Sequence, residues 1–337
     1  MRRARRRGRR PEGGWPLMTV DLSVTLSGRT LPNPVMTASG CAANGRELHR
    51  FFDVSQLGAF VTKTVMMDPR SGRGTPRMAE TASGMLNSIG LQGPGIHAFV
   101  EQDLPWLKSV GARVLVSIAG NTAGEFADVA KVLADSDAFD CVVGVEVNIS
   151  CPNVANRGLV FACDPLSSAK VIALVREQLP RDVPMFAKLT PDVTDIVTIA
   201  DAAVKAGATG LTMINTLLGM VIDTDRLRPH LGGITGGLSG PSIRPVAVRA
   251  LWQVTAAMRD GRFQTVPLIG VGGVRSGRDA LELIAAGASA VQVGTATFND
   301  PTAPQRVLTE LEALAESHGV ARLTELVGVA HEKMVIP

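Results

Sequence analysis

The stretch Val147-Asn148-Ile149-Ser150-Cys151-Pro152-Asn153 ends a strand-like apolar run in a cysteine that lies among asparagines and is followed by a proline. A buried strand is usually continued by Val, Ile or Leu, so polar residues at its carboxyl end need a reason other than packing. A thiol there can act as a nucleophile, an acid or base, or a metal ligand, and amides beside it can bind a polar, planar ligand. The alternative is a small buried side chain in a tight strand-to-helix turn.

This stretch belongs to one of eight short, β-rich runs that alternate with amphipathic helical patterns. The runs cover residues 35–39, 59–65, 113–118, 144–150, 185–190, 210–216, 267–271 and 290–294. The helical patterns include residues 124–134, 165–178, 195–206, 243–258 and 277–286. Eight βα units in sequence predict an α/β fold, the (β/α)8 TIM barrel. Residues 20–32 predict a small N-terminal β-hairpin that caps the amino-terminal end of this barrel.

Composition predicts one large domain preceded by a basic extension. The chain has 337 residues, 45% of them hydrophobic, and its 35 glycines and 20 prolines are spread throughout, so residues 18–337 are expected to form a single domain. Residues 1–17 hold seven arginines against Glu12, so the formal charge of +3 for the whole chain, less +6 for this segment, leaves −3. This segment has no apolar secretion core, and we expect it to be disordered or the product of an upstream start codon, with Met18 as the natural start. We expect no binding to nucleic acid.

Hydropathy and cysteine usage predict a cytoplasmic protein. No stretch reaches the roughly 18 apolar residues that a membrane span requires. The four cysteines show no paired CxxC spacing, which indicates a reducing compartment and excludes a self-contained iron-sulfur cluster or structural zinc site. They are Cys41, Cys141, Cys151 and Cys163. The histidines are scattered and none ends a predicted strand, so we expect no metal site.

Polar residues lie near or after the carboxyl ends of the first six predicted strands. They are Ser39, Lys63, Asn121, Asn148 with Cys151, Lys188, and Asn215 with Thr216. In a barrel these side chains converge on one mouth, whereas each taken alone could be a solvated strand-end residue. Residues 66–95 form the longest irregular stretch of the chain, and a loop of that length in a compact fold is usually functional.

Glycines follow the last two predicted strands, at residues 270–274 and 293–295, where barrels commonly bind phosphate. They indicate a phosphorylated ligand. Lys63 and Lys188 lie inside apolar runs, although lysine is rarely buried without a partner. Either one is a Schiff-base lysine or both are fixed charges that stabilise an anion such as a reduced flavin or a carboxylate. Two lysines together with a cysteine and several asparagines favour the second interpretation.

Taken together, these motifs resemble the dihydroorotate dehydrogenases, the FMN-dependent barrels of pyrimidine synthesis. The resemblance covers nearly all of residues 20–335. It depends on residues 33–40, 62–64, 84–92, 148–153, 215–220 and 235–241 and on the two glycine loops. In that family the base is cysteine in the soluble class 1 and serine in the membrane-associated class, so Cys151 implies class 1. The runs 215–223 and 91–95 look most like the class 1B catalytic subunit.

The resemblance implies a role for each matching residue. Cys151 would be the general base that removes the C5 proton of dihydroorotate, while hydride passes from C6 to N5 of FMN and orotate is formed. Lys188 would stabilise the reduced flavin and Lys63 would serve both flavin and substrate. The implied substrate-binding residues are Lys63, Asn87, Ser88, Ile89, Gly90, Leu91, Asn148, Asn153, Asn215 and Thr216. The implied FMN-binding residues are Ser39, Lys63, Thr64, Asn121, Asn148, Lys188, Ile214, Gly240, Gly272, Gly273, Gly294 and Thr295.

The resemblance also implies partners. Class 1B enzymes pass electrons to NAD⁺ through a second subunit that carries FAD and a [2Fe-2S] cluster, for which this chain lacks the cysteines. A homodimeric core is expected, or a heterotetramer with that subunit. Two alternatives remain: a dihydropyrimidine dehydrogenase-type barrel that acts on uracil or thymine, and a non-redox phosphate-binding barrel with a Schiff-base lysine. Cys41 is expected to be a packed small residue, and residues 154–161 match no family pattern.

Overall fold

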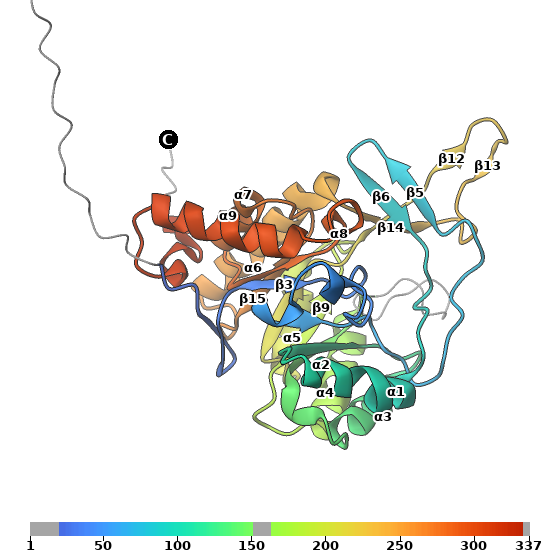
Figure 1. Cartoon of the computed structure of the whole chain (residues 1–337), viewed down its shortest axis with the longest axis horizontal. Helices are drawn as coiled ribbons and strands as arrows, with labels where there is room; N and C mark the ends of the chain where they lie inside the picture. Colours follow the sequence, from blue (N-terminus) through green and yellow to red (C-terminus); the bar gives the residue numbers. More distant parts are fainter. Residues whose placement is uncertain (1–19, 151–162, 333–337) are drawn as a thin grey trace, which may run out of the picture.

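The computed structural model describes residues 20–150 and 163–332 of the chain, and eight parallel strands form its centre (Figure 1). The strands are β3 (Val35–Thr37), β4 (Phe60–Val61), β7 (Val114–Ile118), β8 (Val142–Val147), β9 (Met185–Leu189), β10 (Gly210–Met213), β15 (Leu268–Val271) and β16 (Ala290–Val293). Each pairs with its neighbour in chain order, β16 pairs with β3, and the parallel bridge Met36–Ala59 joins β3 to the start of β4. The eight predicted runs and the (β/α)8 barrel are therefore confirmed.

Helices cover the outside of the barrel, so the strands are buried on both faces and read as apolar runs. They are α1 (Ile96–Ala98), the π-helical turn η3 (Phe99–Asp103), α2 (Leu104–Ser109), α3 (Ala123–Ala134), α4 (Pro165–Gln178), α5 (Ile196–Lys205), α6 (Arg244–Arg259), α7 (Gly277–Ala285), α8 (Ala296–Asn299), α9 (Ala303–Ser317) and α10 (Val329–Glu332). The 3₁₀ turns are η1 (Leu48–Arg50), η2 (Val54–Gln56), η4 (Phe139–Cys141), η6 (Pro241–Ile243) and η7 (Leu323–Leu326). Among the described residues, no helix is both long and apolar enough to cross a membrane.

Side-chain caps determine where several of these helices begin. Thr122, Asp164, Asp195 and Ser276 precede α3, α4, α5 and α7, and each accepts a hydrogen bond from a backbone N–H of the first turn. Each cap satisfies a donor that the helix itself cannot. These short side chains therefore convert the end of each βα loop into a helix start.

The predicted N-terminal hairpin caps the amino-terminal end of the barrel. Strands β1 (Val24–Leu26) and β2 (Arg29–Leu31) pair antiparallel, and the turn between them is formed by Ser27 and Gly28, both with positive φ. Val24, Leu26 and Leu31 are buried in one cluster with residues of the barrel interior, among them Phe186. The hairpin thus closes the end of the barrel opposite to the carboxyl ends of the strands.

A second, antiparallel sheet lies at the other end. Its order is β11 (Leu217–Gly219), β14 (Gly236–Ser239), β6 (Gly84–Asn87) and β5 (Met78–Thr81), and β12 (Ile222–Asp223) with β13 (Arg228–Pro229) extends from it (Figure 1). The expectation of an irregular segment at residues 66–95 was therefore wrong for β5 and β6. Each of these two strands has four residues and one buried side chain, Ala79 in β5 and Leu86 in β6, so they lack the longer apolar alternation by which strands are recognised.

The hairpin gives a test of the fold. Leu26 is 3% exposed, so Leu26→Ala should remove apolar contacts, leave a cavity and lower the free energy of unfolding by about 2–4 kcal/mol. Thr25, its exposed neighbour in β1, serves as control, because Thr25→Ala should change stability by roughly 0.5 kcal/mol or less. Denaturant titration followed by circular dichroism measures both. Equal losses of unfolding free energy in the two variants would contradict the conclusion that the buried face of the hairpin closes this end of the barrel.

Candidate active site

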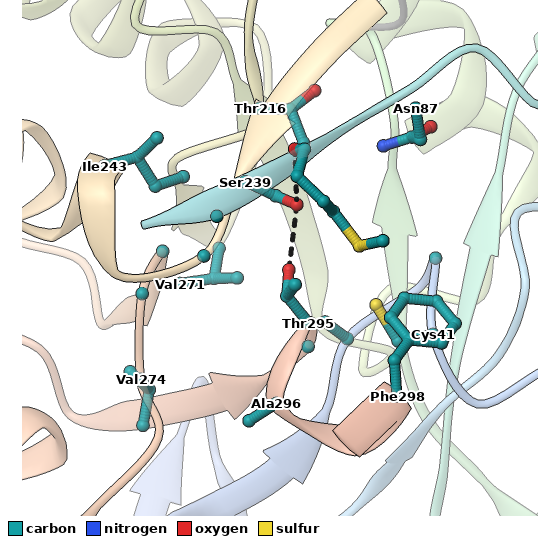
Figure 2. Close-up of a pocket in the computed structure, with 18 of the residues that line it drawn as sticks. Cys41, Asn87, Thr216, Ser239, Ile243, Val271, Val274, Thr295, Ala296 and Phe298 are labelled. Carbon is teal, nitrogen blue, oxygen red and sulfur yellow. Dashed lines mark hydrogen bonds between the residues drawn. The ribbon is translucent and has the colours of Figure 1, made fainter. Parts of the chain in front are cut away.

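A cavity of about 920 Å³ opens at the carboxyl ends of the barrel strands, beneath the small sheet. Its walls come from the loops after β3, β4, β8, β10, β15 and β16 and from β5, β6 and β14, as Figure 2 shows in part. This volume lies within the range of pockets that enclose most of a cofactor-sized ligand. The predicted convergence of strand-end residues on one mouth is observed.

Most of the residues proposed from the sequence line this cavity. They are Ser39, Lys63, Thr64, Asn87, Ile89, Leu91, Asn148, Lys188, Ile214, Asn215, Thr216, Gly240, Gly272, Gly273, Gly294 and Thr295. Ser88, Gly90 and Asn121 are described but do not line it. Cys151 and Asn153 lie outside the described residues.

The three residues that do not line the cavity have other surroundings. Ser88 is fully buried and its backbone N–H donates to the Arg77 carbonyl oxygen. A Cβ added at Gly90 would lie 2.8 Å from Arg73 N, so Gly90 is packed against the chain. Asn121 donates from its side chain and its backbone to the carboxylate of Glu125 in α3. The structure therefore gives these residues packing and capping contacts.

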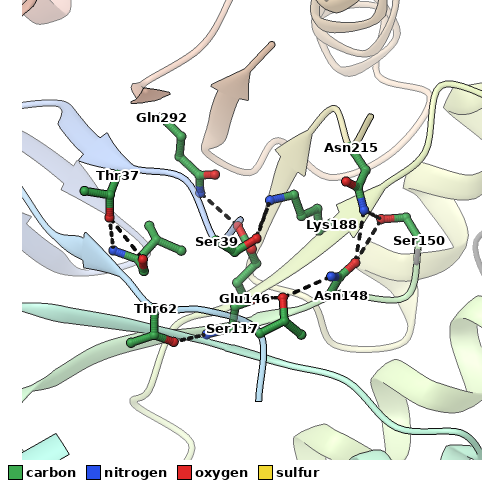
Figure 3. Close-up of polar contacts among 12 residues, drawn as sticks. Thr37, Ser39, Thr62, Ser117, Glu146, Asn148, Ser150, Lys188, Asn215 and Gln292 are labelled. Carbon is green, nitrogen blue, oxygen red and sulfur yellow. Dashed lines mark hydrogen bonds and ion pairs between the residues drawn. The ribbon is translucent and has the colours of Figure 1, made fainter. Parts of the chain in front are cut away.

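Asn148 and Asn215 hold each other in a fixed orientation (Figure 3). The Asn148 amide nitrogen donates to Thr64 Oγ1 over 3.2 Å, and its oxygen accepts from both Ser150 Oγ and Asn215 Nδ2, each at 3.2 Å. Asn215 Nδ2 also donates to Ser150 Oγ over 2.7 Å, and Asn215 Oδ1 accepts from the backbone N–H of Thr216.

These contacts determine which N–H donors and oxygen lone pairs of each amide remain available to bind a ligand. An amide has two N–H donors and an oxygen with two lone pairs. Counting contacts with the described residues, Asn148 has used both lone pairs and keeps one N–H, so it can only donate, whereas Asn215 has used both N–H groups and keeps one lone pair, so it can only accept. The sequence interpretation, in which each amide both donates and accepts, is corrected by this geometry. The pair fits a ligand edge that carries a C=O group near an N–H group.

Glycines shape the opposite end of the cavity. Gly240, Gly272 and Gly273 have φ values of 92°, 134° and 75°, a region in which residues with a Cβ are strained. A Cβ at Gly273 would lie 2.7 Å from Arg244 Cβ and 3.0 Å from the Gly240 carbonyl oxygen. Nearby, Thr295 Oγ1 donates to Ser239 Oγ over 2.8 Å (Figure 2). Bare backbone and hydroxyl groups of this kind are suited to a phosphate group.

A buried ion pair lies at the inner end of the cavity. Lys188 Nζ, on β9, is 3.1 Å from Glu146 Oε1 and 3.2 Å from Ser39 Oγ, and Gln292 Nε2 donates to Glu146 Oε2 over 2.8 Å (Figure 3). Glu146 and Gln292 were not identified as site residues from the sequence. The signal that identified the lysines, a polar residue inside an apolar strand, applies equally to both.

Cys41 lines the cavity as well, next to Lys63 and Lys188. Desolvation raises the pKa of its thiol to about 11, although the two lysines act in the opposite direction. The group is therefore a neutral thiol near pH 7. A neutral thiol favours a non-catalytic Cys41, but the side chain lines the cavity with intermediate exposure, so the expectation that it is a packed residue stays a prediction.

The fold and the cavity define a (β/α)8 barrel of the enzyme type, in which a glycine cradle suited to a phosphate group lies in one cavity with amides of fixed hydrogen-bonding polarity. A family model described as dihydroorotate dehydrogenase matches residues 21–314, and the chain belongs to this family. The resemblance found in the motifs is thus confirmed. The family implies FMN as the catalytic cofactor, and both the cavity volume and the glycine cradle fit that molecule.

Curated relatives agree along almost their whole length. The chain is 48% identical over 308 residues to a protein of Geobacter sp. (strain M21), covering 91% of this chain and 97% of the relative. It is 49% identical over 311 residues to a protein of Pelobacter propionicus, covering 92% and 99%. It is 48% identical over 314 residues to a protein of Desulforudis audaxviator, covering 93% and 99%. Each is named dihydroorotate dehydrogenase B (NAD(+)), catalytic subunit.

The glycine cradle can be tested by FMN binding. Gly273→Ala should weaken FMN binding at least tenfold, because the new methyl group would collide with Arg244 Cβ and displace the cradle. Gly261→Ala is the matched control: Gly261 has φ 72°, close to the 75° of Gly273, but an added Cβ would have nothing within 4 Å. Titration of FMN fluorescence into each apoprotein gives the dissociation constants. Equal weakening in both variants would assign the effect to backbone strain alone.

Proposed function

We propose that this chain catalyses the FMN-dependent oxidation of (S)-dihydroorotate to orotate in the biosynthesis of UMP, with Cys151 as general base. The observation that carries the proposal is the fixed polarity of Asn148 and Asn215, one a donor and the other an acceptor toward a ligand. A pyrimidine ring presents C=O and N–H groups side by side and complements that pair. The names of the relatives, which state the same activity, support the proposal.

Different residues of the chain bind the cofactor, orient the substrate and remove its proton in this proposal. FMN, when bound, supplies the acceptor for the hydride. The glycine cradle at Gly272 and Gly273 holds the phosphate end, Asn148 and Asn215 orient the substrate ring, and Lys63, which lines the cavity, attracts the substrate carboxylate. Ser150, the residue before Cys151, contacts both amides. This proximity in sequence supports a role for the Cys151 thiol in removing the C5 proton of the substrate.

The alternatives have less support. A Schiff base requires a lysine whose amine can attack a carbonyl group, but Lys188 Nζ is paired with the buried Glu146 carboxylate. A barrel that acts on uracil or thymine would need no cation for a substrate carboxylate, whereas Lys63 lines this cavity. Neither alternative is indicated by the family match over residues 21–314.

The names of the relatives indicate NAD⁺ and a catalytic subunit within a larger assembly. The proposal therefore includes a separate subunit that carries FAD and a [2Fe-2S] cluster, bound to a homodimer of this chain. Cys41 and Cys141 are free thiols among the described residues. The proposal places the assembly in the cytoplasm.

The role of Cys151 predicts a specific defect. Cys151→Ser should retain FMN but lose most of the flavin reduction by dihydroorotate near pH 7, by about 10²-fold or more, because a serine hydroxyl ionises far less readily than a thiol. Stopped-flow absorbance at the flavin band measures the rate. Cys163→Ser is the control, because this cysteine is exposed and does not line the cavity. In this variant dihydroorotate should reduce FMN at the same rate as in the unmodified protein. Undiminished bleaching in Cys151→Ser would eliminate the base role.

The electron acceptor can be identified by turnover. The chain alone should oxidise dihydroorotate with an artificial dye but not with NAD⁺, because the proposal assigns NAD⁺ reduction to the separate FAD subunit. Addition of a purified FAD and [2Fe-2S] subunit should confer NAD⁺ reduction, measured at 340 nm. Fumarate and a soluble quinone are assayed in parallel, and rapid turnover of the isolated chain with fumarate would contradict the proposed assembly.

A further inference from the structure

A polar layer crosses the interior of the barrel directly below the cavity (Figure 3). It consists of Glu146 on β8, Lys188 on β9, Gln292 on β16 and Ser39 after β3. Glu146 and Gln292 are 0% exposed and Lys188 is 3% exposed. Charges buried to this extent are stable only where each is paired and hydrogen-bonded. Two apolar side chains of similar size could fill the same space with comparable stability. Such a layer indicates a function for its charges.

The contacts establish the charge on each group. The Lys188 ammonium and the Gln292 amide nitrogen are pure donors, and they contact different oxygens of Glu146. Both carboxylate oxygens therefore accept, which is the pattern of the ionised form. Of the three N–H groups on Lys188, Glu146 and Ser39 accept two. A third remains for a ligand, and Lys188 lines the cavity.

We propose that Glu146 is a positioning residue that sets the reduction potential of the bound FMN by partly cancelling the charge of Lys188. This inference rests on the proposed function. A bare ammonium beside an electron-accepting ring would strongly stabilise the negative charge that the ring gains on reduction. The Glu146 carboxylate, in the same low-dielectric interior, opposes that effect. A lower potential makes the reduced cofactor a better electron donor to a further acceptor.

The chain offers a substitution that changes charge with little change of shape. In Glu146→Gln, the new amide oxygen can accept from Lys188 while its nitrogen faces Gln292. Gln292 Oε1 is buried and has no hydrogen-bond partner among the described residues, so a flip of the Gln292 amide lets that oxygen accept the new N–H. The contacts of residue 146 with both Lys188 and Gln292 are then kept, and the one unpartnered atom of the Gln292 amide becomes its nitrogen instead of its oxygen. Gln292→Met is the matched control, because it disturbs the same layer and removes no charge.

The experiment is a potentiometric titration of the FMN-loaded chain against a reference dye. Glu146→Gln should shift the equilibrium toward reduced FMN at least tenfold, or about 30 mV upward for a two-electron couple, and Gln292→Met should stay within threefold of the unmodified protein. Sulfite, whose addition to oxidised flavin leaves a negative charge on the ring, should bind Glu146→Gln at least tenfold more tightly. An unchanged or lower potential in Glu146→Gln, or an equal shift in Gln292→Met, would overturn the inference.

A further variant covers the case in which Glu146→Gln does not fold. Replacement of a buried ion pair by apolar residues of similar size is usually tolerated, so Glu146→Leu/Lys188→Met can be compared with the unmodified protein. If the two charges largely cancel at the cofactor, the reduction equilibrium of the double variant should stay within tenfold of the unmodified protein, and a larger downward shift, as expected from the loss of an uncancelled ammonium, would overturn the inference. Failure of the unmodified chain to bind FMN would instead contradict the proposed function, so the two failures are distinguishable.

Discussion

In a closed parallel barrel, every strand presents its carboxyl end at the same face, and this constraint underlies the rest of the structure. It brings Ser39, Asn148 and Gly294 to one cavity although they are far apart in the chain. The hairpin packs against the opposite end of the barrel and buries Leu26 and Leu31 there. One end is thus devoted to apolar packing, and the other is free to carry polar groups.

The polar end remains ordered because its side chains satisfy one another. Asn148, Ser150 and Asn215 form a closed set of hydrogen bonds, and Glu146 and Lys188 form an ion pair below them. Buried polar groups of this kind are stable only when nearly all of their donors and acceptors are paired. The ordering of these groups therefore occurs on folding, so a ligand meets a site that already has its shape and polarity.

The barrel and most of the residues that line its cavity could be predicted from the sequence. Two strands of the small sheet and two buried polar residues could not, for physical reasons. Strands buried on both faces read as apolar runs, so the barrel and the anomalous Lys63 and Lys188 stood out. Strands β5 and β6 have no such pattern, because each has only four residues, of which a single one is buried. Glu146 and Gln292 carried the same signal as the lysines, but only the three-dimensional pairing shows that they belong to the site.

Other details depend on geometry that no motif encodes. The reduction of Asn148 to a pure donor and of Asn215 to a pure acceptor follows from which neighbours reach each amide. Asn121 follows a strand as expected, yet its amide contacts Glu125 at the start of α3. The proposed roles of Cys151 and Asn153 stay predictions, since both residues lie outside the described part of the chain.

The raised pKa of Cys41 has a consequence for covalent chemistry. With a pKa of about 11, its reactive thiolate form makes up only ~10⁻⁴ of the population at pH 7, because the thiolate fraction falls tenfold with each unit between pH and pKa. An electrophile or peroxide that enters the cavity would leave Cys41 almost untouched. A chemical label that enters the cavity near pH 7 should therefore react with Cys41 far more slowly than with a thiol of ordinary pKa.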